Sequence, residues 1–131
     1  MIRVLIVDGH AIVRRGIEAL LQEVDDIQVV GETDNGLEAI SLSKKLEPDV
    51  ILMDLLLPAM DGVEATRQIV ARQPHMRVLG MTSFIYHEKI IPAIQAGAMG
   101  YVMQESAPSE LVQSIYKVHR GEQAFDQSIT L

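Results

Sequence analysis

Short apolar runs alternate five times with segments of helical periodicity along this chain, and the alternation constrains its fold more than any other feature. The apolar runs, which are the predicted strands, cover residues 4–7, 27–30, 50–53, 78–81 and 101–103. The helical patterns cover residues 11–23, 35–46, 62–71, 87–96 and 108–119. Because strands that alternate with helices pack as a parallel sheet between two layers of helices, the predicted fold class is α/β.

Five strand–helix units in 131 residues are typical of one domain with a doubly wound, five-stranded parallel sheet in the flavodoxin-like order 2-1-3-4-5. Residues 1–122 are predicted to form this domain. Residues 123–131 have weak periodicity and are interpreted as the start of a linker.

Residues that cap or interrupt helices support these boundaries. Asp34 or Asn35 is expected to cap the second helix and Asp61 the third, because such side chains accept hydrogen bonds from the free N–H groups of a first turn. Ser106 is the candidate cap of the last helix. Pro92 either kinks the fourth helix or marks its true start, because proline interrupts a helix interior.

The composition excludes several functions. Eleven basic and 18 acidic residues give a net charge of −7, which disfavours direct binding to nucleic acid or to an anionic membrane. The lack of cysteine excludes disulfides, thiol catalysis and zinc–thiolate sites. No apolar run approaches the roughly 18 residues that span a bilayer, and the apolar start of the chain is too short for a signal peptide. The cytoplasm is the expected location.

Three polar residues stand at the ends of three predicted strands: Asp8, Asp54 and Thr82. Because the carboxyl ends of parallel strands meet at one edge of a sheet, we expect these side chains to form one site. The crevice of the predicted topology lies between the first and third strands, which end in the two aspartates. A loop rich in proline and glycine, residues 55–62, follows Asp54.

Other families with this topology do not fit the sequence. Residues 8–11 lack the glycine pattern of dinucleotide-binding folds and the Ser/Thr/Gly phosphate loop of flavodoxins. Phosphatases of the haloacid dehalogenase type need a second aspartate two residues after the nucleophile, where this chain has Leu56.

Five segments, in order and at suitable spacing, resemble the receiver domain (CheY-like) of two-component response regulators. The segments are residues 4–10, 13–17, 49–62, 81–83 and 96–101. The resemblance covers nearly the whole chain and is closest to the LuxR/NarL-type subfamily of transcriptional regulators, in which a helix-turn-helix domain follows the receiver. It implies that the linker leads to a C-terminal DNA-binding domain outside this chain.

The resemblance also implies roles for the site residues. Asp54 would accept a phosphoryl group from a sensor histidine kinase. Mg²⁺ would be held weakly by Asp8, Asp54 and the backbone carbonyl of Leu56. Thr82 would bind a phosphoryl oxygen, and Tyr101 would rotate into the space that Thr82 leaves. A static, half-buried role in packing is the alternative for Tyr101.

Two positions depart from the family pattern and leave two functions open. Gly9 stands where the family has a second acidic metal ligand, and Gln104 where it has a lysine that pairs with the phosphoryl group. Losing one carboxylate and one lysine leaves the formal charge of the pocket unchanged. The first hypothesis is a phosphoaccepting receiver, which is not an enzyme beyond self-phosphorylation. The alternative is a degenerate pseudo-receiver that acts only as an interaction or dimerisation module.

Other features are weaker. The resemblance implies a weak homodimer through the first and last helices, and the last helix has more apolar residues than one buried stripe needs. The alternative is that this surplus packs under the linker. Arg14 and Arg15 are expected on a solvated helix face, with docking of a partner as the alternative. The histidines are scattered and expected to be exposed, with no metal site among them: His10, His75, His87 and His119.

Overall fold

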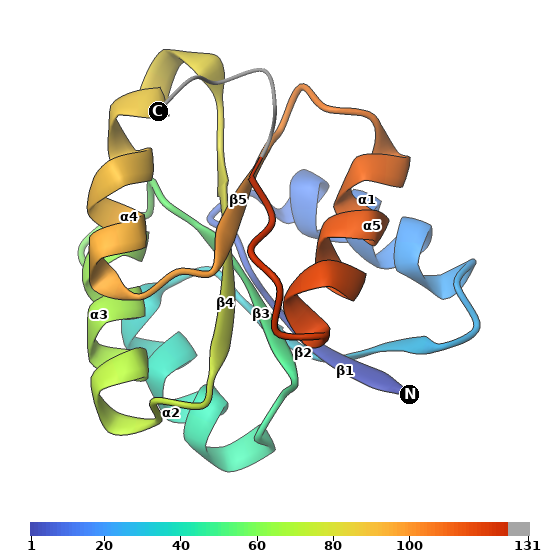
Figure 1. Ribbon diagram of the computed structural model, residues 1–131, viewed down its shortest axis with the longest axis horizontal. Coiled ribbons are helices and arrows are strands. Elements are labelled where there is room, and N and C mark those ends of the chain that lie inside the picture. The colour runs from blue at the N-terminus through green and yellow to red at the C-terminus, as the bar shows by residue number, and fades with distance from the viewer. Residues whose placement is uncertain (126–131) are drawn as a thin grey trace.

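The computed structural model describes residues 1–125, apart from the side chains of Phe84 and Ile85. Five parallel strands form one sheet in the order β2-β1-β3-β4-β5, which confirms the predicted topology (Figure 1). The strands are β1 (Ile2–Val7), β2 (Ile27–Thr33), β3 (Val50–Asp54), β4 (Arg77–Thr82) and β5 (Gly100–Met103). The chain crosses from one side of β1 to the other between β2 and β3, and this leaves the predicted crevice above the ends of β1 and β3.

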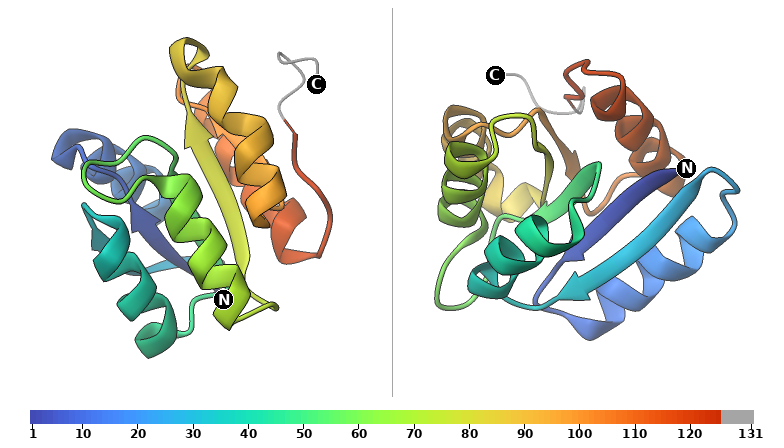
Figure 2. Two further views of the ribbon diagram at one scale, coloured as in Figure 1. Left: turned by 90° about the vertical axis from the view of Figure 1, so that its left-hand side faces the viewer. Right: turned by 90° about the horizontal axis from the view of Figure 1, so that it is seen from below.

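Helices cover both faces of the sheet. One face carries α1 (Ala11–Gln22) and α5 (Pro108–His119), and the other carries α2 (Gly36–Leu46), α3 (Gly62–Arg72) and α4 (Ile90–Ala96) (Figure 1 and Figure 2). The two layers bury separate aliphatic clusters against opposite faces of the same strands. Every residue of β3 is buried, as a central strand covered on both faces requires.

Two of the predicted caps are confirmed and one is wrong. Oδ1 of Asn35 accepts the N–H of Glu38 at 2.8 Å, and Oδ1 of Asp61 accepts the N–H of Glu64 at 2.9 Å. The cap position of α5 is Ala107 instead of Ser106. Proline prefers the first helical position and forces the residue before it into an extended conformation, so Pro108 places the boundary one residue later than expected.

The fourth helix is shorter than predicted. A 3₁₀ segment, η1 (Phe84–Lys89), precedes α4, and Tyr86 within it has non-helical backbone angles of φ −114° and ψ 26°. Because α4 begins at Ile90, Pro92 lies in the first turn, where its missing N–H breaks no helical hydrogen bond. Pro92 therefore marks the start of the helix and does not kink it.

The segment after α5 returns to the sheet. The N–H of Tyr101 donates to the carbonyl of Ala124 at 2.9 Å, and the N–H of Ala124 donates to the carbonyl of Met99 at 3.2 Å. A Cβ at Gly100 would lie 2.1 Å from the carbonyl oxygen of Ala124, so glycine is needed for this approach. The predicted linker thus begins with contacts to β5, and its residues 126–131 lie outside the described residues.

Candidate functional site

The ends of β1, β3 and β4 bring Asp8, Asp54 and Thr82 together, as the sequence predicts. Each of these side chains is buried. A pocket of about 70 Å³ opens beside them, and its lining includes Asp54, Thr82 and Gln104. The wall is completed by His10, Leu56, Ser83 and Tyr86. A small, polar pocket at this edge of the sheet is the place where such folds bind their ligands.

Asp8 is fully buried, with one satisfied and one unsatisfied oxygen. Its Oδ1 accepts the N–H of His10 at 2.8 Å, while Oδ2 has no hydrogen-bond partner within residues 1–125. Arg14 donates to the backbone carbonyl of Asp8 at 2.7 Å and to Glu32 at 2.9 Å. The side chain of Arg14 is only 17% exposed, so the expectation of a solvated position is wrong for this residue, whereas Arg15 is exposed as expected. This arginine holds the end of β1 and forms no ion pair with the Asp8 carboxylate.

Asp54 lies at the end of β3 with a perturbed ionisation. Burial raises its pKa to about 6, and the neighbouring charge of Asp8 acts in the same direction. Hydrogen bonds from the N–H groups of Leu56 and Gly9, and the nearby His10, oppose this rise. The bond from Leu56 to Oδ1 is 3.0 Å long. At neutral pH the side chain is mostly a carboxylate, although its buried surroundings disfavour the charged form.

The loop after Asp54 is held tightly against the strand. A Cβ at Gly62 would lie 2.0 Å from the carbonyl oxygen of Asp54, so no other residue fits there without movement of the backbone. At the start of α3, Oδ2 of Asp61 accepts a bond from Nζ of Lys89 at 3.2 Å. These contacts hold the C-terminal end of the loop against its start at Asp54 and Leu55, which limits where Leu56 can lie.

The other predicted site residues occupy different surroundings. Oγ1 of Thr82 donates to the carbonyl of Tyr86 at 3.2 Å, and Gln104 is an exposed residue of the pocket wall. Tyr101 does not line the pocket, since its side chain packs with Ile90 and Met103 on the α4 face. It is 1% exposed, and its ring contacts Phe125 with 5.7 Å between ring centroids.

The sequence interpretation missed His10. One ligand atom from each of Asp8, His10 and Asp54 lies within 4.8 Å of the other two, so an imidazole joins the carboxylate pair. The side chain of His10 is exposed, as expected, but it lies at the mouth of the pocket and not apart from it. Its position two residues after the strand-end aspartate is the signal that could have placed it there.

The comparisons with known proteins assign this chain to one class of protein. The family model of the response regulator receiver domain matches residues 4–116. The chain therefore belongs to the response regulator receiver domain family, and the two-component signalling class predicted from the sequence is confirmed.

Individual relatives refine the assignment. The chain is 41% identical over 129 residues to the transcriptional regulatory protein LiaR of Bacillus subtilis, and 43% identical over 128 residues to the response regulator protein VraR of Staphylococcus aureus. Each of these alignments covers 98% of this chain and 61% of the relative's length. A crystal structure of a LuxR-family two-component response regulator from Aurantimonas sp. SI85-9A1 is similar with a TM-score of 0.92 and 38% identity, covering 97% of this chain and 91% of that one. The resemblance to the LuxR/NarL-type subfamily is confirmed.

The pocket fits the Mg²⁺ of the family, with fewer ligands. The unpartnered Oδ2 of Asp8 is the kind of oxygen that a hard cation binds, and Asp54 supplies a second carboxylate. Gly9 supplies none. A Cβ at Gly9 would make only ordinary contacts, at 3.5 Å to Pro58 and 3.9 Å to Leu57, so a larger side chain fits there.

We expect Gly9→Asp to bind Mg²⁺ on the order of tenfold more tightly than the natural chain, because it restores a third carboxylate at the site. Calorimetric titration with MgCl₂ measures the change. Gly9→Asn is the matched control, with the same size and no charge, and should gain little. Equal affinities of the natural chain and Gly9→Asp would contradict the account of Gly9 as a lost ligand.

In residues 1–125, no helix is long and apolar enough to span a bilayer.

Proposed function

We propose that this domain accepts a phosphoryl group on Asp54 from a sensor histidine kinase. The observation that carries the proposal is the buried pair of Asp8 and Asp54 beside an open pocket, with one oxygen of Asp8 left unpartnered. Buried carboxylates without a cation are costly in a structural role, and they suit a site that binds a metal ion and a phosphoryl group.

The chemistry follows from the surroundings of Asp54. A carboxylate oxygen attacks the phosphorus of the donor, the phosphorus–nitrogen bond to the donor histidine breaks, and its electron pair returns to the imidazole. The N–H of Leu56 holds the carboxylate in place through its bond to Oδ1. A bound Mg²⁺, with Asp8, Asp54 and the carbonyl of Leu56 as its protein ligands, would supply charge to the transferring oxygens.

The signal would leave through Thr82 and Tyr101. In the structure, the hydroxyl of Thr82 donates a hydrogen bond to the carbonyl of Tyr86. It would give up that hydrogen bond in order to bind a phosphoryl oxygen. Tyr101 lies on the strand next to Thr82, beneath Phe125. The chain after α5 therefore touches the ring that the switch would move, which gives the signal a route towards a following domain.

The partners are proposed with this function. Because the chain spans 61% of the curated relatives it matches, one of them named as a transcriptional regulatory protein, we propose a C-terminal DNA-binding domain as the recipient of the signal. The site suits phosphoryl acceptance and not catalysis on a separate substrate, and the cytoplasm is the proposed location.

Acetyl phosphate with Mg²⁺, followed by intact mass measurement, tests the proposal. The natural chain should gain the mass of one phosphoryl group, and Asp54→Asn should gain none. Asp25→Asn is the matched control, because it makes the same change at an exposed carboxylate outside the site, and it should gain the phosphoryl group like the natural chain. A gain that persists in Asp54→Asn would refute the acceptor, and no gain in the natural chain would favour the pseudo-receiver.

Gly9 and Gln104 are the observations that favour this second candidate, a phosphorylation-independent interaction module. Neither residue offers a charge to the metal or the phosphoryl group.

A weak homodimer through α1 and α5 is part of either function. A groove of about 310 Å³ runs between these helices, with mainly apolar walls that include Val13, Gly16, Leu20 and Leu111. An apolar groove between two helices can take apolar side chains of a partner, and two-fold pairing is the commonest closed arrangement, so a second copy of this chain is the partner we propose.

We expect sedimentation equilibrium to show reversible dimerisation of the natural chain at high micromolar concentration. Gly16→Glu should abolish it, because Cβ at this position meets open space in the monomer and the carboxylate would enter the groove. Ala19→Glu, an exposed change on the same helix outside the groove, should leave it intact. A natural chain that stays monomeric would remove dimerisation from this account.

A further inference from the structure

We propose that the pocket is a site for a divalent transition ion of the Zn²⁺ or Co²⁺ type, with His10 as a ligand beside Asp8 and Asp54. The inference deepens the proposed function, because it concerns the same pocket, but it requires neither phosphorylation nor a kinase. It adds a nitrogen ligand where Gly9 leaves the family's second carboxylate missing.

The three side chains lie within reach of one ion. One ligand atom from each of them lies within 4.8 Å of the other two. Ligands that surround a transition ion at about 2.1 Å are about 3 to 4 Å apart, so a small rotation closes the remaining gap. His10 is able to make it, because its side chain is 75% exposed and Nδ1 already lies 3.4 Å from Oδ1 of Asp8.

A second, independent observation points to a cation. Oδ2 of Asp8 is buried and has no hydrogen-bond partner among the described residues. Arg14 pairs with Glu32 and Lys89 pairs with Asp61, so neither of these cations is paired with the two carboxylates. Two buried carboxylates with no cation between them are unfavourable, and a bound divalent ion would neutralise their negative charge.

The donor set decides which ion is favoured. Imidazole nitrogen is a good ligand for borderline ions such as Zn²⁺ and Co²⁺, whereas Mg²⁺ strongly prefers oxygen. A carboxylate at position 9 would make the set all oxygen. With glycine at position 9 and histidine next to it, the available third side-chain ligand is a nitrogen, and the selectivity of the site moves towards the transition ions.

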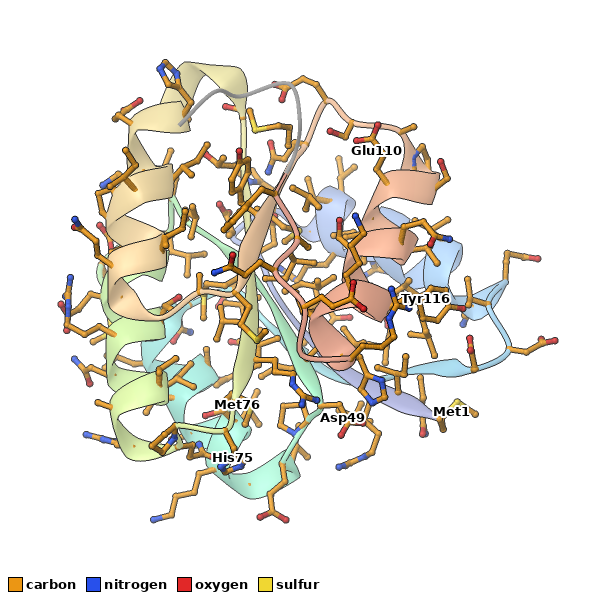
Figure 3. The ribbon with its side chains drawn as sticks, viewed as in Figure 1. Met1, Asp49, His75, Met76, Glu110 and Tyr116 are labelled. Atoms are coloured by element: carbon orange, nitrogen blue, oxygen red, sulfur yellow. The ribbon has the colours of Figure 1, made fainter. Side chains whose placement is uncertain are left out.

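Separate calorimetric titrations of the metal-free full chain with CoCl₂ and MgCl₂ test this assignment. Transition ions bind most sites more tightly than Mg²⁺, so the decisive quantity is the loss caused by His10→Ala for each ion. We expect Co²⁺ affinity to fall by about tenfold or more and Mg²⁺ affinity by less than about threefold. His75→Ala is the matched control, an exposed histidine before β4 at the opposite end of the sheet (lower part of Figure 3), and should change neither.

Two further measurements keep the outcome clear. His10→Asn keeps a polar side chain without the imidazole, and it should lose Co²⁺ affinity as His10→Ala does. A hyperfine-shifted ring resonance in the proton NMR spectrum of the Co²⁺ complex should disappear in both variants. Unchanged Co²⁺ binding in the His10 variants, or equal losses for the two ions, would overturn the assignment.

Phosphorylation by acetyl phosphate with Mg²⁺ is measured on the same samples. A chain that is phosphorylated, but binds Co²⁺ equally well without His10, overturns the metal assignment alone. A chain that binds Co²⁺ through His10, but gains no phosphoryl group, overturns the proposed function alone.

Discussion

Gly62→Ala is expected to destabilise the domain by about 3 kcal/mol or more, because the added methyl group has no space. Its Cβ would lie 2.0 Å from the carbonyl oxygen of Asp54 and 2.7 Å from Cα of Leu55. Both neighbours are backbone atoms of the buried β3 end, so relief requires the loop or the strand to move. Because that loop carries Leu56, whose N–H holds Asp54, the variant should also weaken phosphoryl acceptance.

Urea unfolding of the natural chain and the variant measures the loss. Gly16→Ala is the control, since it adds the same methyl group inside α1 where nothing lies within 4 Å of the new Cβ. Alanine favours a helix interior over glycine by up to about 1 kcal/mol, so this change should stabilise the domain. Similar stability of the two variants would show that the approach of α3 to β3 is not as tight as described.

Asp54→Asn is expected to stabilise the metal-free domain at neutral pH by on the order of 2 kcal/mol. Burial and the charge of Asp8 raise the pKa of Asp54 to about 6, from 3.8 in its ordinary state. The folded protein therefore binds this proton more readily than the unfolded chain does. Ionising Asp54 at neutral pH costs stability, and the amide removes that cost. The figure allows for water at the mouth of the pocket, which screens part of the effect.

The direction of the pH dependence follows from the raised pKa. Well below pH 3.8 Asp54 is protonated in both states and costs nothing. Between pH 3.8 and about 6 the unfolded chain ionises while the folded protein does not, so stability is lost as the pH rises; above about 6 both states are ionised and the loss is complete. The advantage of Asp54→Asn should thus grow between about pH 4 and pH 7 and be constant above it. Urea unfolding in EDTA across this range measures it, with the exposed Asp25→Asn as control. An advantage that shrinks as the pH rises would show that Asp54 is stabilised as a carboxylate.

Local rules explain where the sequence interpretation was right and wrong. The caps at Asn35 and Asp61 were predictable because a cap depends on a few neighbouring residues. The prediction of Ser106 as the cap is wrong because Pro108, at the first helical position, determines the start of α5 more strongly than the hydroxyl group of a serine does. In the sequence, Pro92 is compatible with either a kink or the start of the fourth helix. The structure has a 3₁₀ segment before Ile90, so the helix starts close to Pro92.

By itself, the sequence determined the strand order and the meeting of Asp8, Asp54 and Thr82. The alternation of apolar runs with helical patterns admits few topologies. In a parallel sheet the carboxyl ends of all strands lie at the same edge, so polar residues at those ends come together. The two departures, Gly9 and Gln104, were also visible without a structure, because they depend on position along the chain alone.

Only the tertiary structure decided the contacts around that site. His10 beside the two carboxylates, Arg14 on the backbone of Asp8, and the ring of Tyr101 beneath Phe125 each depend on how separate segments pack. A helical or strand pattern tells which face of an element is buried, but not which residue of another element meets it. That choice is made by the packing of the whole domain, and here it places an imidazole at the pocket and the chain after α5 on the edge strand.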